Sequence, residues 1–238
     1  MKPCHRNVSE VQESPLDRSQ PQPVGAPVPR PRLRGWLHAA ATPLAVVVAV
    51  LLWRAAAPGL PRLSVLVFGV TLVGLFATSG AYHVPNWPSR VRHWLSRADV
   101  AMIQLFIAAS FTPFAVHALS GAWRLWSLVV AWSIAVIGAI VAASPIKAAR
   151  WLGVLGYTAF ASLAVVPLLR IARVIPPTGI ALIALSSLLY LVGGVIYARR
   201  HPDPWPRTFG FHEVFHLLVV AAGATHVVAV WEFALPLG

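Results

Sequence analysis

Seven long apolar segments dominate the sequence, each close to the ~20 residues that an α-helix needs to cross the hydrocarbon core of a membrane. Connectors bearing proline, glycine and arginine separate them, and proline favours a helix end because it cannot continue the backbone hydrogen bonding. The pattern predicts an all-α integral membrane protein, a seven-transmembrane helix bundle over residues 35–238. The segments cover residues 36–53, 63–83, 99–119, 125–143, 151–169, 178–198 and 211–231.

Composition agrees with this class. Hydrophobic residues make up 58% of the chain and charged residues 11%, whereas a soluble domain has about 25% charged residues. The net charge of +12 would suggest nucleic acid in a soluble protein, but the basic residues are scattered through short connectors without a nucleic-acid-binding motif. We therefore expect membrane lipids and no nucleic acid as partners. The single cysteine, Cys4, excludes an intrachain disulfide and a cysteine-based zinc site.

The ends of the chain are predicted from charge and composition. Residues 1–34 are rich in proline and show little periodicity, which predicts a disordered Pro/Arg-rich cytoplasmic tail. Successive connectors lie on alternate sides of the membrane. One of the two sets is richer in Lys and Arg, among them Arg90, Arg92 and Arg97, and this set is expected on the cytoplasmic side. The N-terminus is then cytoplasmic and the C-terminus outside. A G-protein-coupled receptor runs in the opposite direction, so that class is excluded.

Polar side chains occur where hydrocarbon should exclude them. His83 ends the second segment, Asp99 begins the third, and His212 and His216 begin the seventh. Ionisable residues in or beside a membrane are costly and mark a functional site by default. In the predicted topology all four reach the cytoplasmic face. The last two histidines share one helix face, about 6 Å apart along the axis.

Imidazole and carboxylate are zinc ligands, and three histidines would leave a fourth tetrahedral position open for water. Asp99 could accept a hydrogen bond or a proton from that water, or it could orient an imidazole from behind; the sequence leaves both roles open. Ser79 lies one helical turn before His83, so its hydroxyl is expected beside that imidazole. His226 lies about 15 Å deeper than His216 and is expected to make a polar contact or to form part of a cavity. His38 is expected to pack or to bind backbone.

Short motifs extend these observations along the chain. They are Arg34-Gly35-Trp36-Leu37-His38, Ser79-Gly80-Ala81-Tyr82-His83, Asp99 with 106–113, 212–220 and Thr225-His226. With these motifs the sequence resembles the hemolysin III branch of the progestin and adipoQ receptor (PAQR) family over most of residues 32–232. The resemblance implies seven spans with a cytoplasmic N-terminus, and a zinc ion held by His83, His212 and His216 with Ser79 and Asp99 nearby. The wider superfamily includes ceramide-cleaving enzymes.

We therefore predict zinc-dependent hydrolysis of a lipid, with a ceramide-like amide bond as the favoured target and Asp99 and Ser79 as catalytic residues. The first alternative is a non-enzymatic receptor or a membrane-perturbing, haemolysin-like protein in which zinc is structural. A second is a zinc peptidase, because residues 212–216 fit H-E-x-x-H with Glu213 as the base; Asp99 would then be the third ligand and His83 would be unexplained. A transporter gains little support, since we find no internal repeat.

Overall fold

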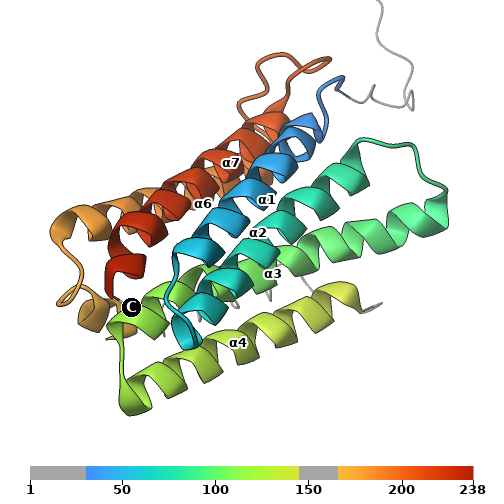
Figure 1. The fold of residues 1–238 in the computed structure, drawn as a ribbon. Helices are drawn as coiled ribbons and strands as arrows, with labels where there is room; N and C mark the ends of the chain where they lie inside the picture. The colour runs from blue at the N-terminus through green and yellow to red at the C-terminus, as the bar shows by residue number, and fades with distance from the viewer. Residues whose placement is uncertain (1–30, 145–165, 238) are drawn as a thin grey trace, which may run out of the picture.

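The computed structural model describes residues 31–144 and 166–237, and every long regular element in these ranges is a helix (Figure 1). Six of the helices are long and apolar enough to cross a membrane. This confirms the prediction of a multi-pass, membrane-embedded helical bundle. The helices are α1 (Trp36–Ala55), α2 (Leu60–His83), α3 (Ser89–Ala118), α4 (Gly121–Ala143), α6 (Pro177–Arg199) and α7 (Phe211–Ala229), the last continued by a π-helical turn, η1 (Val230–Ala234), and a 3₁₀ turn, η2 (Leu235–Leu237).

Two predicted segments lie mostly outside the described residues. Of the fifth span, 151–169, only its last part is described, and it belongs to a helical stretch over residues 166–171. Of the tail, only residues 31–34 are described. There the backbone N–H groups of Arg32 and Leu33 donate to the carbonyls of Arg207 and Thr208, each at 3.1 Å. The seven-span count, the disordered tail and the membrane orientation stay predictions.

The third helix begins earlier than its apolar pattern indicates. α3 starts at Ser89 and not at residue 99, so Asp99 lies inside the helix. Pro88 occupies the N-cap, where proline is tolerated because its missing N–H has no partner within the helix. The turns between Ser89 and Asp99 carry arginine and histidine. Hydropathy detects the part of a helix that meets hydrocarbon, whereas the helix itself extends past that layer.

Chain neighbours pack side by side, and the last helix returns to the first. α1 packs on α2, α2 on α3 and α3 on α4, while α6 packs on α7 and α7 also contacts α1 (Figure 1). The start of α7 and the end of α2 therefore meet at one end of the bundle, close to where α1 begins.

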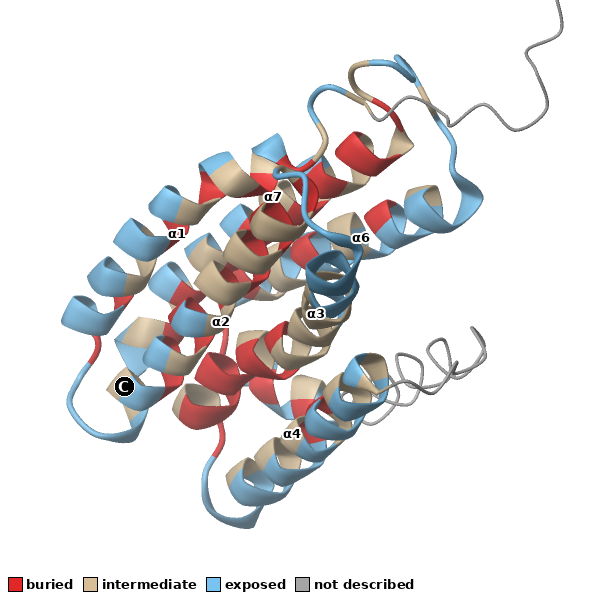
Figure 2. Cartoon of the chain, turned by 90° about the vertical axis from the view of Figure 1, so that its right-hand side faces the viewer, coloured by how far each residue is buried: buried red, intermediate tan, exposed pale blue. Residues whose placement is uncertain are grey.

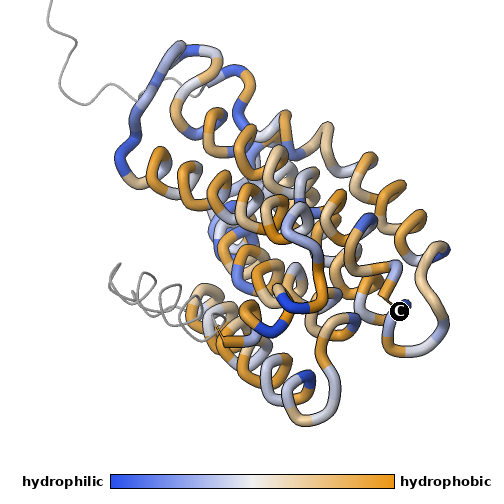
Figure 3. Tube along the Cα trace, turned by 90° about the vertical axis from the view of Figure 1, so that its left-hand side faces the viewer, coloured by the Kyte–Doolittle hydropathy of each residue, from blue (hydrophilic) through white to orange (hydrophobic). Residues whose placement is uncertain are grey.

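The outer surface of the bundle is apolar, unlike that of a soluble protein. Large apolar side chains face outward, among them Leu44, 68% exposed, and Leu191, 65% exposed, as the pale blue outer faces of the helices in Figure 2 show. Hydrophilic residues concentrate in the connectors (Figure 3). An exposed apolar surface of this extent suits lipid and not water. In contrast, several histidines and a glutamate are buried in the interior: His38, His83, His212, His216, His226 and Glu213.

Candidate metal centre

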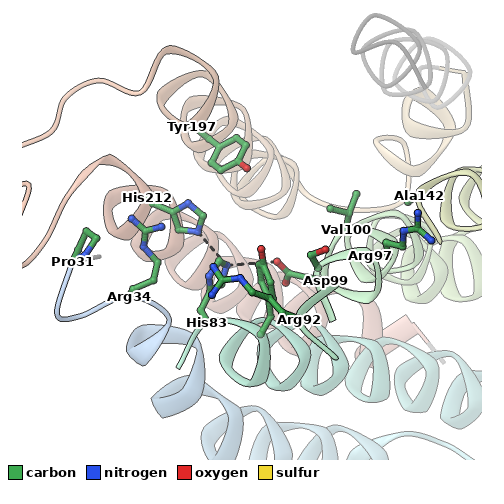
Figure 4. Close-up of a pocket in the computed structure, with 12 residues that line it drawn as sticks. Pro31, Arg34, His83, Arg92, Arg97, Asp99, Val100, Ala142, Tyr197 and His212 are labelled. Atoms are coloured by element: carbon green, nitrogen blue, oxygen red, sulfur yellow. Dashed lines mark hydrogen bonds and ion pairs between the residues drawn. The ribbon is translucent and has the colours of Figure 1, made fainter. Parts of the chain in front are cut away.

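Three imidazoles from two helices converge at one end of the bundle. His83 is the last residue of α2, while His212 and His216 occupy the first two turns of α7. One ring nitrogen from each lies within 4.8 Å of those of the other two, and all three side chains are buried. The Nε2 atoms of His83 and His212 are 3.2 Å apart (Figure 4). The structure thus brings together the three histidines that the sequence selected, and this cluster could bind a metal ion.

The chemistry of the cluster fits a zinc-like ion. Two nitrogens that bind one tetrahedral zinc at 2.0–2.1 Å lie about 3.3–3.4 Å from each other, close to the separation between His83 and His212. Within the described part of the chain, the Nδ1 atom of His216 is one of six buried side-chain atoms without a hydrogen-bond partner. A metal ion bound to the imidazoles would account for three of them being buried so close together.

Asp99 faces this cluster from α3. Its Oδ2 atom lies 3.7 Å from Nε2 of His83, and the Ser79 hydroxyl interacts with the same carboxylate. The ring nitrogen that faces Asp99 is therefore the one that faces His212. A carboxylate that oriented His83 from behind would bind the opposite ring nitrogen. The sequence left open whether Asp99 lies beside the metal-binding nitrogens or behind an imidazole. In the structure it lies on the side of the imidazole cluster.

An open cleft of about 850 Å³ leads to the cluster. His83, His212 and Asp99 line it (Figure 4), whereas His216 is not among its lining residues. Three arginines, Arg34, Arg92 and Arg97, also line it. A small molecule or a lipid headgroup can therefore approach two of the histidines and the carboxylate from the end of the bundle.

Glu213, between the two histidines of α7, serves a different purpose from the one that H-E-x-x-H suggests. It is fully buried and forms an ion pair with Arg34, which precedes α1. Its other oxygen, Oε2, accepts the backbone N–H of Gly210 at 2.8 Å, closing the N-terminus of α7. Both oxygens are thus engaged in holding α7 to the start of α1. Glu213 is therefore not placed to act as the catalytic base that the peptidase alternative requires.

Replacing Glu213 with glutamine is expected to destabilise the fold by about 3 kcal/mol, because removing one partner of a buried ion pair leaves the other charge uncompensated. Chemical unfolding in detergent micelles measures the effect. Arg34→Gln should have a similar effect, and the double variant should lose less than the sum of the two. Glu232→Gln is the matched control, since Glu232 is exposed beyond the end of α7. Additive losses in the double variant would contradict the pairing.

His226 does not join the cluster, which confirms the expectation of a polar contact. Its Nδ1 atom lies 3.3 Å from the hydroxyl oxygen of Ser186, and its Nε2 atom lies 2.9 Å from the carbonyl oxygen of Ser110. Both ring nitrogens thus have partners on neighbouring helices, and this histidine ties α7 to α3 and α6 in the middle of the bundle.

Comparison with known proteins decides the family. A family profile described as "Haemolysin-III related" matches residues 27–227. The chain belongs to this family. Its predicted kinship with hemolysin III and PAQR-type proteins is confirmed.

Relatives of this haemolysin III-related chain occur in bacteria, animals and plants. It is 24% identical to the human "Monocyte to macrophage differentiation factor" over 208 residues, which are 83% of this chain and 82% of that protein. It is 25% identical to the "Hemolysin-3 homolog" of Bacillus subtilis over 158 residues, 66% of this chain and 71% of the relative. A rice "Heptahelical transmembrane protein ADIPOR2" is 30% identical over 190 residues, 73% of this chain and 81% of that protein.

The motif at the first span of this haemolysin III-related chain supports the histidine cluster from α1. His38 stacks on His216, with ring centroids 4.0 Å apart and planes within 1° of parallel. Gly35, at φ +83°, lies so close to His83 that an added Cβ would be 2.3 Å from the His83 Cβ. Only glycine combines this backbone conformation with so close an approach. With Arg34 bound to Glu213, the motif contacts both histidine-bearing helices.

Sequence reasoning missed this supporting role of α1. The expectation that His38 packs is confirmed, but its partner, a candidate metal ligand, was not foreseen. The sequence offered no helical spacing as a signal, because Arg34 lies in the turn before α1. The contact of both residues with α7 follows from the packing of α1 against that helix.

Proposed function

We propose that this haemolysin III-related protein is a zinc-dependent hydrolase that cleaves an amide bond of a lipid. The observation that carries the proposal is the convergence of three buried imidazoles and one carboxylate at the inner end of an open cleft. Three histidine ligands leave one tetrahedral position for a reactant, as in catalytic zinc sites. A lipid substrate agrees with a site that lies at the end of membrane-spanning helices.

The proposed topology has seven spans, a cytoplasmic N-terminus and an outside C-terminus, with the metal centre near the cytoplasmic face. Arg34, Arg92 and Arg97 gather around the cleft at this end of the bundle, and arginine enrichment is typical of the cytoplasmic side. The rice relative is described as heptahelical, which supports a further span over residues 151–169.

His83, His212 and His216 would hold the zinc ion through their ring nitrogens. When bound, zinc would polarise the scissile carbonyl and ease the deprotonation of water. Asp99 is close enough to the cluster to accept the proton of the attacking water at a carboxylate oxygen, and then to return it to the leaving nitrogen. The Ser79 hydroxyl would hold that carboxylate in position. His38 would keep the ring of His216 from rotating.

Metal removal tests the proposal. Purified protein in lipid nanodiscs should hydrolyse the amide bond of a short-chain N-acyl amino alcohol. Treatment with a chelator should lower this rate by more than about 100-fold, and stoichiometric zinc should restore it. Circular dichroism before and after chelation checks that the helices persist. If zinc-loaded protein does not cleave the amide bond of this probe, the hydrolase proposal fails.

A structural metal is the second candidate function, and one observation favours it. The ligands come from α2 and α7, which are far apart in the chain, so an ion would join the two helices as a cross-link even without turnover. In that case the protein would act as a receptor or would perturb membranes. Dye leakage from protein-containing vesicles that persists in variants of the three histidines, together with an absence of lipid turnover, would favour this candidate.

A further inference from the structure

We infer that the cleft above the candidate metal centre takes the phosphate of an anionic lipid headgroup, and that Arg92 and Arg97, at two places in its lining, supply the positive charge. This inference deepens the proposed function and rests on it for the reaction, because it names the charge that the substrate carries. A guanidinium group recognises a phosphate monoester well, through bidentate charge-assisted hydrogen bonds.

Position along α3 supports the inference. Arg92, Ser96 and Val100 line the cleft at a spacing of four residues, and Asp99 follows Ser96 by three, so these residues share one broad helix face. Arg97, which also lines the cleft, lies about 140° around the helix from Arg92. Arg92 lies about 10 Å from Asp99 along the helix axis. The guanidinium and the proposed proton acceptor are thus at different depths of one wall. A substrate would contact both if the distance between its phosphate and its amide matched this separation, less the reach of the arginine side chain.

Charge balance gives the second argument. Arg34 is paired with Glu213, whereas no acidic side chain in the described ranges pairs with Arg92 or Arg97. The acidic side chains near this end of the bundle are already engaged. Asp99 faces His83, and Oδ1 of Asp203 accepts the backbone N–H of Phe211 at 2.8 Å. The positive charge of the two arginines is therefore not balanced within this part of the protein.

The contacts that the two arginines do make leave most of their donors for a ligand. The Arg92 guanidinium lies 5.6 Å from the centre of the Tyr82 ring. Arg97 lies 5.3 Å from the Trp94 ring, and its Nη1 donates to the carbonyl of Ala143 at 3.3 Å. A guanidinium has five N–H donors. Aromatic contacts restrict the position of each group without using those donors.

A general preference for arginine on the cytoplasmic side would explain the charge of these residues but not their place in the cleft. Arg90 provides the comparison. It lies in the first turn of the same helix and is exposed, yet it does not line the cleft. It is the matched control for a variant that removes the charge of Arg92 and Arg97.

Binding of two probes tests the inference on full-length, zinc-loaded protein in nanodiscs of zwitterionic lipid. One probe is a short-chain N-acyl amino alcohol with a phosphate monoester, and the other is its unphosphorylated parent. Wild-type protein and Arg90→Gln should bind the phosphorylated probe at least about tenfold more tightly than the parent. The double variant R92Q/R97Q should lose that preference, and R92K/R97K should regain part of it because lysine restores the charge.

The outcomes separate this inference from the hydrolase proposal. Equal binding of both probes to wild type, or a preference that survives in R92Q/R97Q, overturns the phosphate site. Inorganic phosphate alone, if it binds as tightly as the phosphorylated probe, overturns the assignment to a lipid. Turnover of the probes is measured in parallel. Hydrolysis of both probes without a preference for the phosphorylated one supports the hydrolase proposal and excludes the phosphate site. Arginine-dependent binding without turnover supports the phosphate site and excludes the hydrolase proposal.

Discussion

Replacing both His212 and His216 with alanine is expected to abolish stoichiometric metal binding. The two residues supply two of the three clustered imidazoles, and His83 alone would leave a site with one protein nitrogen. Since even a lost outer-shell contact weakens metal affinity by 10–100-fold, removal of two direct ligands should exceed about 100-fold. Elemental analysis of purified protein should fall from about one zinc per chain to background, and lipid turnover should fall with it.

The control for this prediction is a variant with the same number of histidines removed from exposed positions. His93 and His201 are both exposed, so H93A/H201A should keep its zinc. Circular dichroism of H212A/H216A checks that the helices remain. Equal zinc in the wild type and in H212A/H216A would end the assignment of the metal to this cluster, whatever the turnover.

Replacing Asp99 with asparagine is expected to separate metal binding from catalysis. Asparagine keeps the size of the side chain but cannot take up a proton. The variant should therefore retain zinc while its kcat falls by about 10²–10⁴-fold, the usual contribution of a general acid–base group. Ser79→Ala should have a smaller effect in the same direction, because Ser79 acts through the Asp99 carboxylate.

Ser96→Ala is the matched control for Asp99→Asn, because Ser96 lines the same cleft on the same helix face and donates its hydroxyl to the carbonyl of His93 at 2.8 Å. It should keep both zinc and turnover. An Asp99→Asn variant with the kcat of the wild type would exclude Asp99 as the proton acceptor. Loss of zinc in that variant would instead assign Asp99 to metal binding.

Both predictions depend on how α1, α2, α3 and α7 meet at one end of the bundle. Because of these contacts, we expect the stability of this end of the bundle and its proposed chemistry to be coupled. Glu213 lies between the two histidines of α7 and binds Arg34, and His38 stacks on His216. Variants that loosen α1 are therefore expected to disturb metal binding without removing a ligand.

The sequence by itself determined the membrane class, the described spans and the three histidines. Hydropathy over about 20 residues reports directly on a helix that crosses hydrocarbon, and the four-residue spacing of His212 and His216 is a local property of a helix. An imidazole at the end of an apolar run is conspicuous because it is costly there. None of these inferences requires knowledge of which helices are neighbours.

Only the tertiary structure decided which groups face one another. The partner of Glu213 is 179 residues away in the chain, and the stack of His38 on His216 depends on α1 lying against α7. The side of His83 that Asp99 faces depends on the rotation of α3 about its axis. In a membrane, hydrophobicity puts helices in the bilayer, but close packing and polar contacts between helices choose their partners and rotations. Those contacts join distant parts of the chain, so local sequence patterns do not specify them.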